Sequence, residues 1–219
     1  MAEGGLIDIS PPVSPALAVW PGDTPYSFEW LCQIEQGANL DLGTVRTTVH
    51  LGAHADAPRH YARGGADIGS RPLELYYGPC EVFHVDVGRG ERVRPAHLPG
   101  PPRAPRVLLR TGTFPDPERW NADFAALSPE LIDGLAAAGV RLVGIDTPSV
   151  DPQSSKALES HQALARHDMA VLEGLVLDRA PPGLYTLIAL PLPLRGADAS
   201  PVRAALAPWT SVAGQGVPR

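Results

Sequence analysis

Residues 128–145 read Ser-Pro-Glu-Leu-Ile-Asp-Gly-Leu-Ala-Ala-Ala-Gly-Val-Arg-Leu-Val-Gly-Ile. Ser128 followed by Pro129 and an acidic residue is a typical helix start, because the serine oxygen can cap free backbone N–H groups and proline already has a helical φ. Gly139 provides the matching helix end. The mainly apolar segment 141–145 then predicts a buried strand. A helix that leads directly into a strand is typical of α/β proteins.

Segments rich in β-branched and apolar residues predict four further strands, at residues 42–50, 81–87, 106–111 and 184–190. A second helix is expected over residues 155–167, with an apolar face formed by Ala157, Leu158, Leu164 and Ala165. Because strands outnumber clear helices, we expect a mixed sheet with helices and not a doubly wound sheet. The expected fold class is α/β with a mixed sheet, in a single domain over residues 1–219.

Composition and charge exclude several classes of protein. The 219 residues include 25 Pro and 22 Gly, but an apolar content of 44% argues against a disordered chain. A formal net charge of −6 argues against a nucleic-acid-binding surface. No apolar run approaches the roughly 18 residues of a membrane span, and the first residues do not resemble a signal peptide. We therefore expect a cytoplasmic protein that binds a small molecule, and neither nucleic acid nor membrane.

Several common catalytic motifs are absent from the sequence. It has no Gly-x-Ser-x-Gly segment, no Gly-x-x-x-x-Gly-Lys-Ser/Thr loop, and no Gly-x-Gly-x-x-Gly segment after a strand. Lys156 opens an exposed helix and is poorly placed for a Schiff base. Cys32 and Cys80 are too few for a disulfide scaffold or a thiolate zinc site. The remaining signal comes from histidines and acidic residues.

Three of the seven histidines lie within one segment, His50-Leu-Gly-Ala-His54-Ala-Asp56-Ala-Pro-Arg-His60. The glycine and the proline within it disfavour a helix. We expect a strand that ends at His50, followed by a turn at Gly52 that brings His54 and Asp56 back beside it. Two imidazoles and a carboxylate suit Zn²⁺ or a similar ion, and three protein ligands leave a coordination position open for catalysis. The alternative is a polar strand end with incidental surface histidines.

Two later residues are candidate ligands of a second ion. His161 lies on the apolar face of the second predicted helix, where a lone histidine is usually a core residue. Glu173 interrupts an apolar run, where a carboxylate needs an ion-pair partner or a bound cation. Considered together with the upstream histidines, both are candidate ligands of a dinuclear centre. His84, inside an apolar strand, and His97, beside a proline-rich loop, are expected to have no role in the site.

Residues 50–61 resemble the His-x-Gly-Thr/Ala-His-x-Asp-x-Pro-x-His motif of the cyclase-like metal-dependent hydrolases. The similarity extends over most of the chain, through Asp8-Ile-Ser-Pro-Pro, Val19-Trp-Pro-Gly-Asp-Thr-Pro and Gly144-Ile-Asp-Thr-Pro-Ser-Val-Asp-Pro. The second of these segments makes the chain most similar to the kynurenine formamidase (arylformamidase) branch of bacterial enzymes. Ala53 stands where many relatives have threonine; this change leaves the ligands intact and affects only a supporting hydrogen bond.

The resemblance implies a swivelling α/β/β fold, a homodimer, and two Zn²⁺ ions per subunit, with Mn²⁺ as the other candidate ion. It implies that the first ion binds His50, His54 and Asp56. It implies that the second ion binds Asp56 and His161, with Glu173 contacting both ions.

The resemblance also implies an activity, the hydrolysis of N-formyl-L-kynurenine to L-kynurenine and formate in tryptophan degradation. A metal-activated water would attack the formyl group, His60 would act as general acid/base, and Trp20 would contact the aryl ring of the substrate. The nearest alternative is a related hydrolase of another aryl amide or of a cyclic imide such as isatin, with Mn²⁺ as a candidate ion. An alternative of another class is a non-enzymatic metal-binding or dimeric structural protein, against which His60 and the open coordination position argue.

Overall fold

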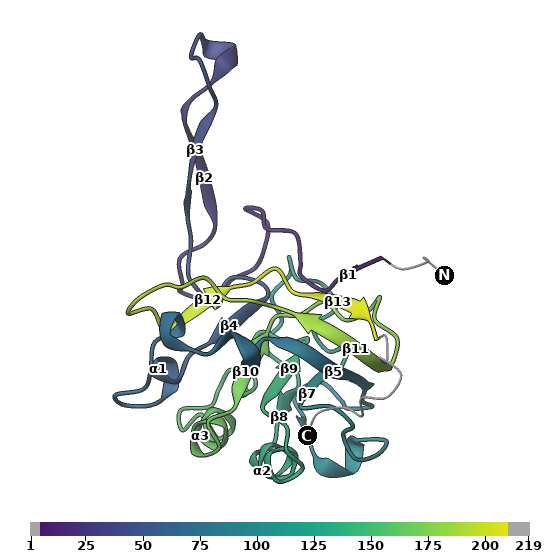
Figure 1. Ribbon diagram of the computed structural model, residues 1–219. Helices are drawn as coiled ribbons and strands as arrows, with labels where there is room; N and C mark the ends of the chain where they lie inside the picture. The colour runs from purple at the N-terminus through teal and green to yellow at the C-terminus, as the bar shows by residue number, and fades with distance from the viewer. Residues whose placement is uncertain (1–4, 210–219) are drawn as a thin grey trace.

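The computed structural model describes residues 5–209, and within this range nine strands form one curled mixed sheet (Figure 1). In spatial order, the strands of this sheet are β1 (Ile7–Asp8), β13 (Ala205–Pro208), β11 (Gly183–Ile188), β5 (Tyr77–His84), β7 (Arg106–Arg110), β9 (Leu142–Ile145), β10 (Ala170–Glu173), β4 (His54–Asp56) and β12 (Ala199–Pro201). The pairs β5–β7, β7–β9 and β9–β10 are parallel, and the other pairs are antiparallel. The predicted mixed-sheet α/β class is confirmed.

Two helices, α2 (Pro129–Ala137) and α3 (Glu159–Arg166), lie side by side below the central strands in Figure 1. The predicted start of α2 is confirmed, since Oγ of Ser128 accepts a hydrogen bond from the backbone N–H of Leu131 at 3.2 Å. The remaining short elements are α1 (Pro58–Tyr61), η1 (Ile34–Gln36), η2 (Ile68–Ser70), η3 (Leu73–Leu75), η4 (Pro95–His97), and the small strands β6 (Arg92–Val93) and β8 (Ala126–Leu127). No helix within residues 5–209 combines the length and apolar character needed to cross a membrane.

The apolar core consists of two clusters that the central strands separate. Along β7, Val107 and Leu109 pack with the residues of α2 and α3, whereas Leu108 belongs to the cluster on the other face of the sheet. This alternation follows from the twofold side-chain period of a strand. Gly144 on β9 leaves room for Leu108, because a Cβ at this position would overlap the leucine side chain. The polar centre described below therefore rests on strands that are buried on both faces.

The second predicted helix is four residues shorter at its start than expected. The helix α3 begins at Glu159 because Leu158 adopts a left-handed conformation with φ 50°. Oγ of Ser155 accepts a hydrogen bond from the N–H of Leu158 at 3.0 Å, which closes a turn before the helix. The predicted apolar face was wrong for Ala157, which is exposed. The buried residues of α3 are Ser160, His161, Ala163 and Leu164.

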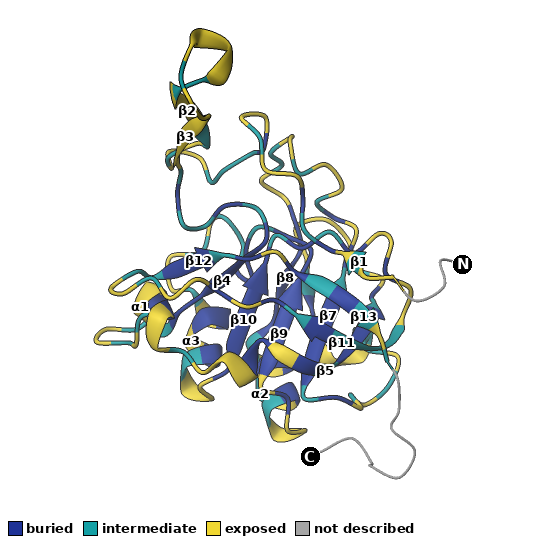
Figure 2. Cartoon of the chain, turned by 45° about the horizontal axis from the view of Figure 1, so that its top comes forward, coloured by how far each residue is buried: buried dark blue, intermediate teal, exposed yellow. Residues whose placement is uncertain are grey.

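A two-stranded hairpin, β2 (Ser27–Cys32) and β3 (Leu42–Arg46), projects from the body of the protein (Figure 1). It is largely exposed, in contrast to the buried strands of the main sheet (Figure 2). Its exposed apolar side chains are Phe28, Trp30, Leu31, Ile34, Leu40, Leu42 and Val45. An arm of this composition is unusual for a surface that faces only water.

Candidate metal centre

The five predicted ligands come together where β4, β10 and α3 meet. The antiparallel pairing of β4 with β10 places Glu173 directly opposite His54. Asp56 lies two residues further along β4, and α3 contributes His161. His50 lies in the segment before β4, so the centre collects residues from three distant parts of the sequence.

The local structure around the histidine motif differs from the prediction in one respect. The strand expected over residues 42–50 ends at Arg46, because its partner strand β2 begins opposite it at Ser27 and leaves later residues without a ladder. His54 and Asp56 instead lie on a strand of the main sheet, β4. The predicted turn is present at Gly52, which has a left-handed φ of 54°. The turn thus separates a hairpin in solvent from a buried strand.

Asp56 is the middle of the cluster, and its side chain is completely buried. Oδ1 of Asp56 lies 2.9 Å from Nδ1 of His50 and 3.4 Å from Nε2 of His54. Oδ2 lies 3.4 Å from Nε2 of His161. Nε2 of His54 and Nε2 of His161 each lie 3.4 Å from one oxygen of Glu173. Two carboxylates therefore face three imidazoles at contact distance.

Four buried polar atoms of this cluster have no hydrogen-bond partner. They are Nε2 of His54, Nε2 of His161 and both carboxylate oxygens of Asp56. Buried polar atoms are nearly always hydrogen-bonded, so a group of such atoms that converge requires an explanation. Nitrogen and carboxylate oxygen atoms are ligands of Zn²⁺ and of similar divalent ions. His50, His54 and Asp56 each offer one ligand atom within 4.8 Å of the others, so the residues present fit a cation.

Hydrogen bonds behind two of the histidines leave their Nε2 atoms facing the cluster. Nδ1 of His54 donates to the carbonyl oxygen of Gly52 at 2.8 Å, and Nδ1 of His161 lies 2.8 Å from Oδ2 of Asp151. Oδ1 of Asp151 is in turn 3.2 Å from Nη1 of Arg92. Such second contacts orient histidine ligands and set their tautomer. No role was predicted for Asp151 from the sequence, although the segment that resembles the family includes it.

The charges of the cluster strongly shift the pKa values of His50 and Asp56. Burial alone lowers the pKa of His50, but Asp56 and Asp198 outweigh burial and raise this pKa to about 9. Burial raises the pKa of Asp56, and the neighbouring imidazoles of His161, His50 and His54 nevertheless hold it well below its usual value. The carboxylate of Asp56 is therefore ionised and His50 attracts a proton, which a bound cation would replace.

His60 lies on α1 beside the predicted ligands. Its ring centroid is 4.2 Å from that of His50 and 5.9 Å from that of His161. Nδ1 of His60 lies 3.1 Å from Oδ2 of Asp198, a residue for which no role was predicted from the sequence. About a third of the His60 side chain is exposed, whereas His54 and His161 are almost completely buried. This exposure distinguishes His60 from these two candidate ligands and leaves it accessible to a substrate.

A cavity of about 270 Å³ opens beside the cluster. Its lining includes the cluster residues His50, His54, His60, His161 and Glu173, and the aromatic residues Trp20, Phe114 and Trp120. The rings of Trp20 and Trp120 meet edge to face with centroids 5.3 Å apart. Trp20 therefore lies in the lining as predicted, whereas Phe114 and Trp120 were not found from the sequence. His84, for which no role was expected, is outside this lining and contacts the carbonyl oxygen of Ala180 at 2.9 Å.

The fold and the site together define a class of protein, a mixed-sheet α/β protein with a buried His/carboxylate centre suited to divalent cations. Residues 7–152 match the Cyclase family model, described as "Putative cyclase". The chain belongs to this family.

Known structures resemble the chain over nearly its whole length. One, described as a potential metal-dependent hydrolase with cyclase activity, has a TM-score of 0.80 and 26% identity and covers 94% of this chain and 99% of its own. A predicted metal-dependent hydrolase from Bacillus stearothermophilus has a TM-score of 0.79, 26% identity and the same coverage. Isatin hydrolase A from Labrenzia aggregata, bound to benzyl benzoate, has a TM-score of 0.76 and 22% identity and covers 93% of each chain. At that identity, the last similarity shows the fold alone.

Proposed function

We propose that the protein is a metal-dependent hydrolase that cleaves N-formyl-L-kynurenine to L-kynurenine and formate. The observation that carries this proposal is a single cavity lined both by the buried His/carboxylate centre and by the tryptophans Trp20 and Trp120. The His/carboxylate centre can hold cations that activate water, and the tryptophans suit a flat aryl group. The two similar structures described as metal-dependent hydrolases support the reaction class.

The residues of the cavity suit amide hydrolysis. His50, His54 and Asp56 would hold one cation, and Asp56 and His161 a second, with Glu173 contacting both; Zn²⁺ is the proposed ion, and the same ligands accept Mn²⁺. When bound, such cations supply Lewis-acid activation of a water molecule and of the formyl carbonyl.

The arylamine is a poor leaving group without a proton on its nitrogen. His60 is positioned to take a proton from the attacking water and to deliver it to this nitrogen as the carbon–nitrogen bond breaks. Water thus supplies the oxygen added to the formyl carbon and the hydrogen gained by the amine; its second hydrogen is released as a proton, and formate leaves as the second product. Trp20 would hold the aryl ring.

A direct assay tests this proposal. The purified protein, loaded with Zn²⁺ or with Mn²⁺, is incubated with N-formyl-L-kynurenine while the absorbance of kynurenine is recorded, and a chelator-treated sample is the control. We expect product formation in the metal-loaded samples alone. A metal-loaded protein that forms no product would refute the substrate assignment, and a protein that binds metal but hydrolyses no amide or imide would favour the non-enzymatic alternative.

A second candidate substrate is a cyclic aryl imide such as isatin. None of the described residues that line the cavity is lysine or arginine, so the lining offers neither of these side chains to the carboxylate of an amino-acid substrate. An uncharged imide has no such group to pair. The isatin hydrolases of the same fold are consistent with this candidate. The ratio of kcat/KM for N-formyl-L-kynurenine to that for isatin, measured on one preparation, decides between the two.

We also infer that the protein is a homodimer in which the β2–β3 hairpin contacts the second copy. Phe28, Trp30 and Val45 are each at least 42% exposed on this arm, which extends beyond the body of its own chain (Figure 2). Contact with a second copy would remove these apolar side chains from water and so stabilise a dimer. Light scattering after size-exclusion chromatography should give twice the chain mass of 23.2 kDa, and the double variant Phe28→Ser/Trp30→Ser should give the single mass. A wild-type monomer would contradict the inference.

A further inference from the structure

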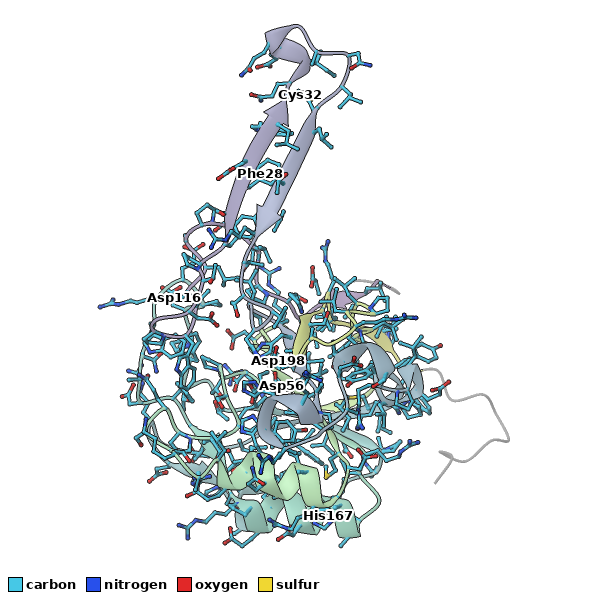
Figure 3. All side chains as sticks on the ribbon, turned by 90° about the vertical axis from the view of Figure 1, so that its left-hand side faces the viewer. Phe28, Cys32, Asp56, Asp116, His167 and Asp198 are labelled. Atoms are coloured by element: carbon cyan, nitrogen blue, oxygen red, sulfur yellow. The ribbon has the colours of Figure 1, made fainter. Side chains whose placement is uncertain are left out.

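Asp198 is an acidic residue beside the candidate centre that the proposed chemistry does not use. It directly precedes β12, and the pairing of β12 with β4 places Ala199 opposite Asp56. The backbone N–H of Ala57 donates to the carbonyl oxygen of Asp198 at 2.8 Å. Asp198 and Asp56 accordingly lie in the same part of the protein body (Figure 3). The sheet itself therefore fixes the backbone of Asp198 next to the histidine motif.

One oxygen of Asp198 contacts two histidines at once. Oδ2 of Asp198 lies 3.0 Å from Nε2 of His50 and 3.1 Å from Nδ1 of His60. An ionised carboxylate can only accept hydrogen bonds, so each of these ring nitrogens carries a hydrogen atom. The two rings are tilted by 48° with centroids 4.2 Å apart, which allows a single acceptor to reach both.

The hydrogen bonds to Asp198 determine what each ring offers on its other side. In a neutral imidazole, a hydrogen atom on one nitrogen leaves a lone pair on the other. For His50 in the metal-loaded protein, where the ring is neutral, the free nitrogen is Nδ1, which faces the candidate ligands and lies 2.9 Å from Oδ1 of Asp56. For His60 the free nitrogen is Nε2. Nδ1 of His50 can therefore bind a cation, and Nε2 of His60 can accept a proton.

The geometry points to Asp198 as a positioning residue that fixes the tautomers of His50 and His60 together, so that His50 presents Nδ1 to the cation and His60 presents Nε2 to the substrate. This role rests on the proposed function, in which His50 is a ligand and His60 transfers the proton. Contacts behind a histidine ligand typically account for tenfold to hundredfold in metal affinity or activity. A shared acceptor would couple cation binding to the orientation of the proton-transfer group.

A competing account makes Asp198 a ligand. His50, His60 and Asp198 each offer one ligand atom within 4.8 Å of the others, so this group could itself hold an ion. The two accounts differ in the number of ions bound. A positioning residue leaves the number of bound ions unchanged when it is removed, whereas removal of a ligand lowers it.

The test compares Asp198→Ala with a matched control, Asp67→Ala. Oδ2 of Asp67 accepts a hydrogen bond from the backbone N–H of Gly196 at 2.6 Å, so Asp67 holds the segment before Asp198 without contacting either histidine. Long-range ¹H–¹⁵N NMR spectra of the full-length zinc-loaded proteins report the tautomer of each histidine. We expect hydrogen on Nδ1 of His60 in the wild type and in Asp67→Ala, and a mixture of tautomers in Asp198→Ala.

Metal binding and kinetics supply two further readouts of the same variants. Asp198→Ala should bind the wild-type number of Zn²⁺ ions with about tenfold to hundredfold lower affinity. Its kcat for N-formyl-L-kynurenine should fall about a hundredfold or more, while KM changes by less than about threefold, because proton transfer is impaired and substrate contacts are not. Asp67→Ala should match the wild type in Zn²⁺ binding and in its kinetic constants.

Three results would overturn the role of Asp198: hydrogen on Nε2 of His60 in the wild type, an unchanged tautomer in the alanine variant, or the loss of one Zn²⁺ equivalent. If Asp198→Ala does not fold, Asp198→Asn keeps the shape, and its amide N–H groups should reduce the fraction of His60 with hydrogen on Nδ1. Predicted tautomers in a protein that does not hydrolyse N-formyl-L-kynurenine would refute the proposed substrate alone. Turnover with unchanged tautomers would refute the positioning role alone.

Discussion

Replacement of Asp56 by Asn should abolish the stabilisation that Zn²⁺ gives the folded protein. The carboxylate of Asp56 is fully buried, and three imidazole nitrogens lie 2.9 to 3.4 Å from its oxygens. Both oxygens lack hydrogen-bond partners. An amide of the same shape has one oxygen instead of two and no charge, so each proposed cation would lose a charged ligand. The variant therefore removes a carboxylate ligand that both ions would share.

The size of the effect follows from linkage. A cation at about 100 times its Kd stabilises the folded state by about 2.7 kcal/mol. For a chain of 150 to 250 residues, each kcal/mol corresponds to a Tm change of about 2–4 °C. The wild-type protein should therefore unfold about 5–11 °C higher with Zn²⁺ than with a chelator, whereas Asp56→Asn should gain less than about 2 °C.

Differential scanning calorimetry with and without Zn²⁺ measures both shifts. Asp116→Asn is the matched control, because Asp116 is exposed on a loop away from the cluster (Figure 3) and should leave the wild-type shift intact. Equal shifts in the wild type and Asp56→Asn would refute the ligand role of Asp56. A wild-type protein that Zn²⁺, Mn²⁺ and chelator leave unchanged would refute the metal centre itself.

Further predictions concern individual members of the site. His60→Ala should lower kcat by about 10²–10⁴-fold with its metal content unchanged, and loss of metal in this variant would contradict the assigned role. The apparent affinity for Zn²⁺ should rise from about pH 6 to pH 9. The pKa of His50 is raised to about 9, so below that pH a cation must displace a proton from this ring. A calorimetric titration that finds the same Zn²⁺ affinity at all these pH values would contradict this prediction. Asp151→Ala should weaken Zn²⁺ binding by about tenfold to hundredfold, since His161 loses its orienting partner; an unchanged affinity would exclude that role. Trp20→Ala should raise KM by about threefold to tenfold with little change in kcat, and steady-state kinetics in which KM stays constant would remove Trp20 from the substrate contacts.

Much of the fold could be predicted because the central strands carry a strong local signal. The strands β7 and β9 contain short apolar runs that are buried on both faces, and α2 has a serine cap, a proline and a terminal glycine in sequence. Such signals act within a few residues and do not depend on distant contacts. The strand expected over residues 42–50 failed at its end, because where β3 stops is set by the length of its partner β2.

The candidate site could be predicted where its residues lie close in sequence or resemble a family motif. His50, His54 and Asp56 share one short segment, and Glu173 stands out as a charge in an apolar run. Asp198 gave no such signal, because its relation to His60 arises only when β12 pairs with β4. Asp198 joins the cluster because of the order of the strands in the sheet, and the neighbouring residues in sequence do not predict that order.

The aromatic lining of the cavity shows the same limit. Trp20 was found through its family-like segment, whereas Trp120 and Phe114 follow from packing between loops that are distant in sequence. Nε1 of Trp120 donates to Oε1 of Gln153 at 2.9 Å, a contact that fixes the ring and that no local pattern predicts.

The proposed dinuclear centre can be observed directly by anomalous diffraction at the zinc absorption edge from crystals of the zinc-loaded protein. We predict two peaks, one in contact with His50, His54 and Asp56 and the other with Asp56 and His161, with Glu173 near both. Diffraction that shows no zinc among these residues, or zinc bound elsewhere with the four buried atoms still unpartnered, would contradict the metal centre and the hydrolase function built on it.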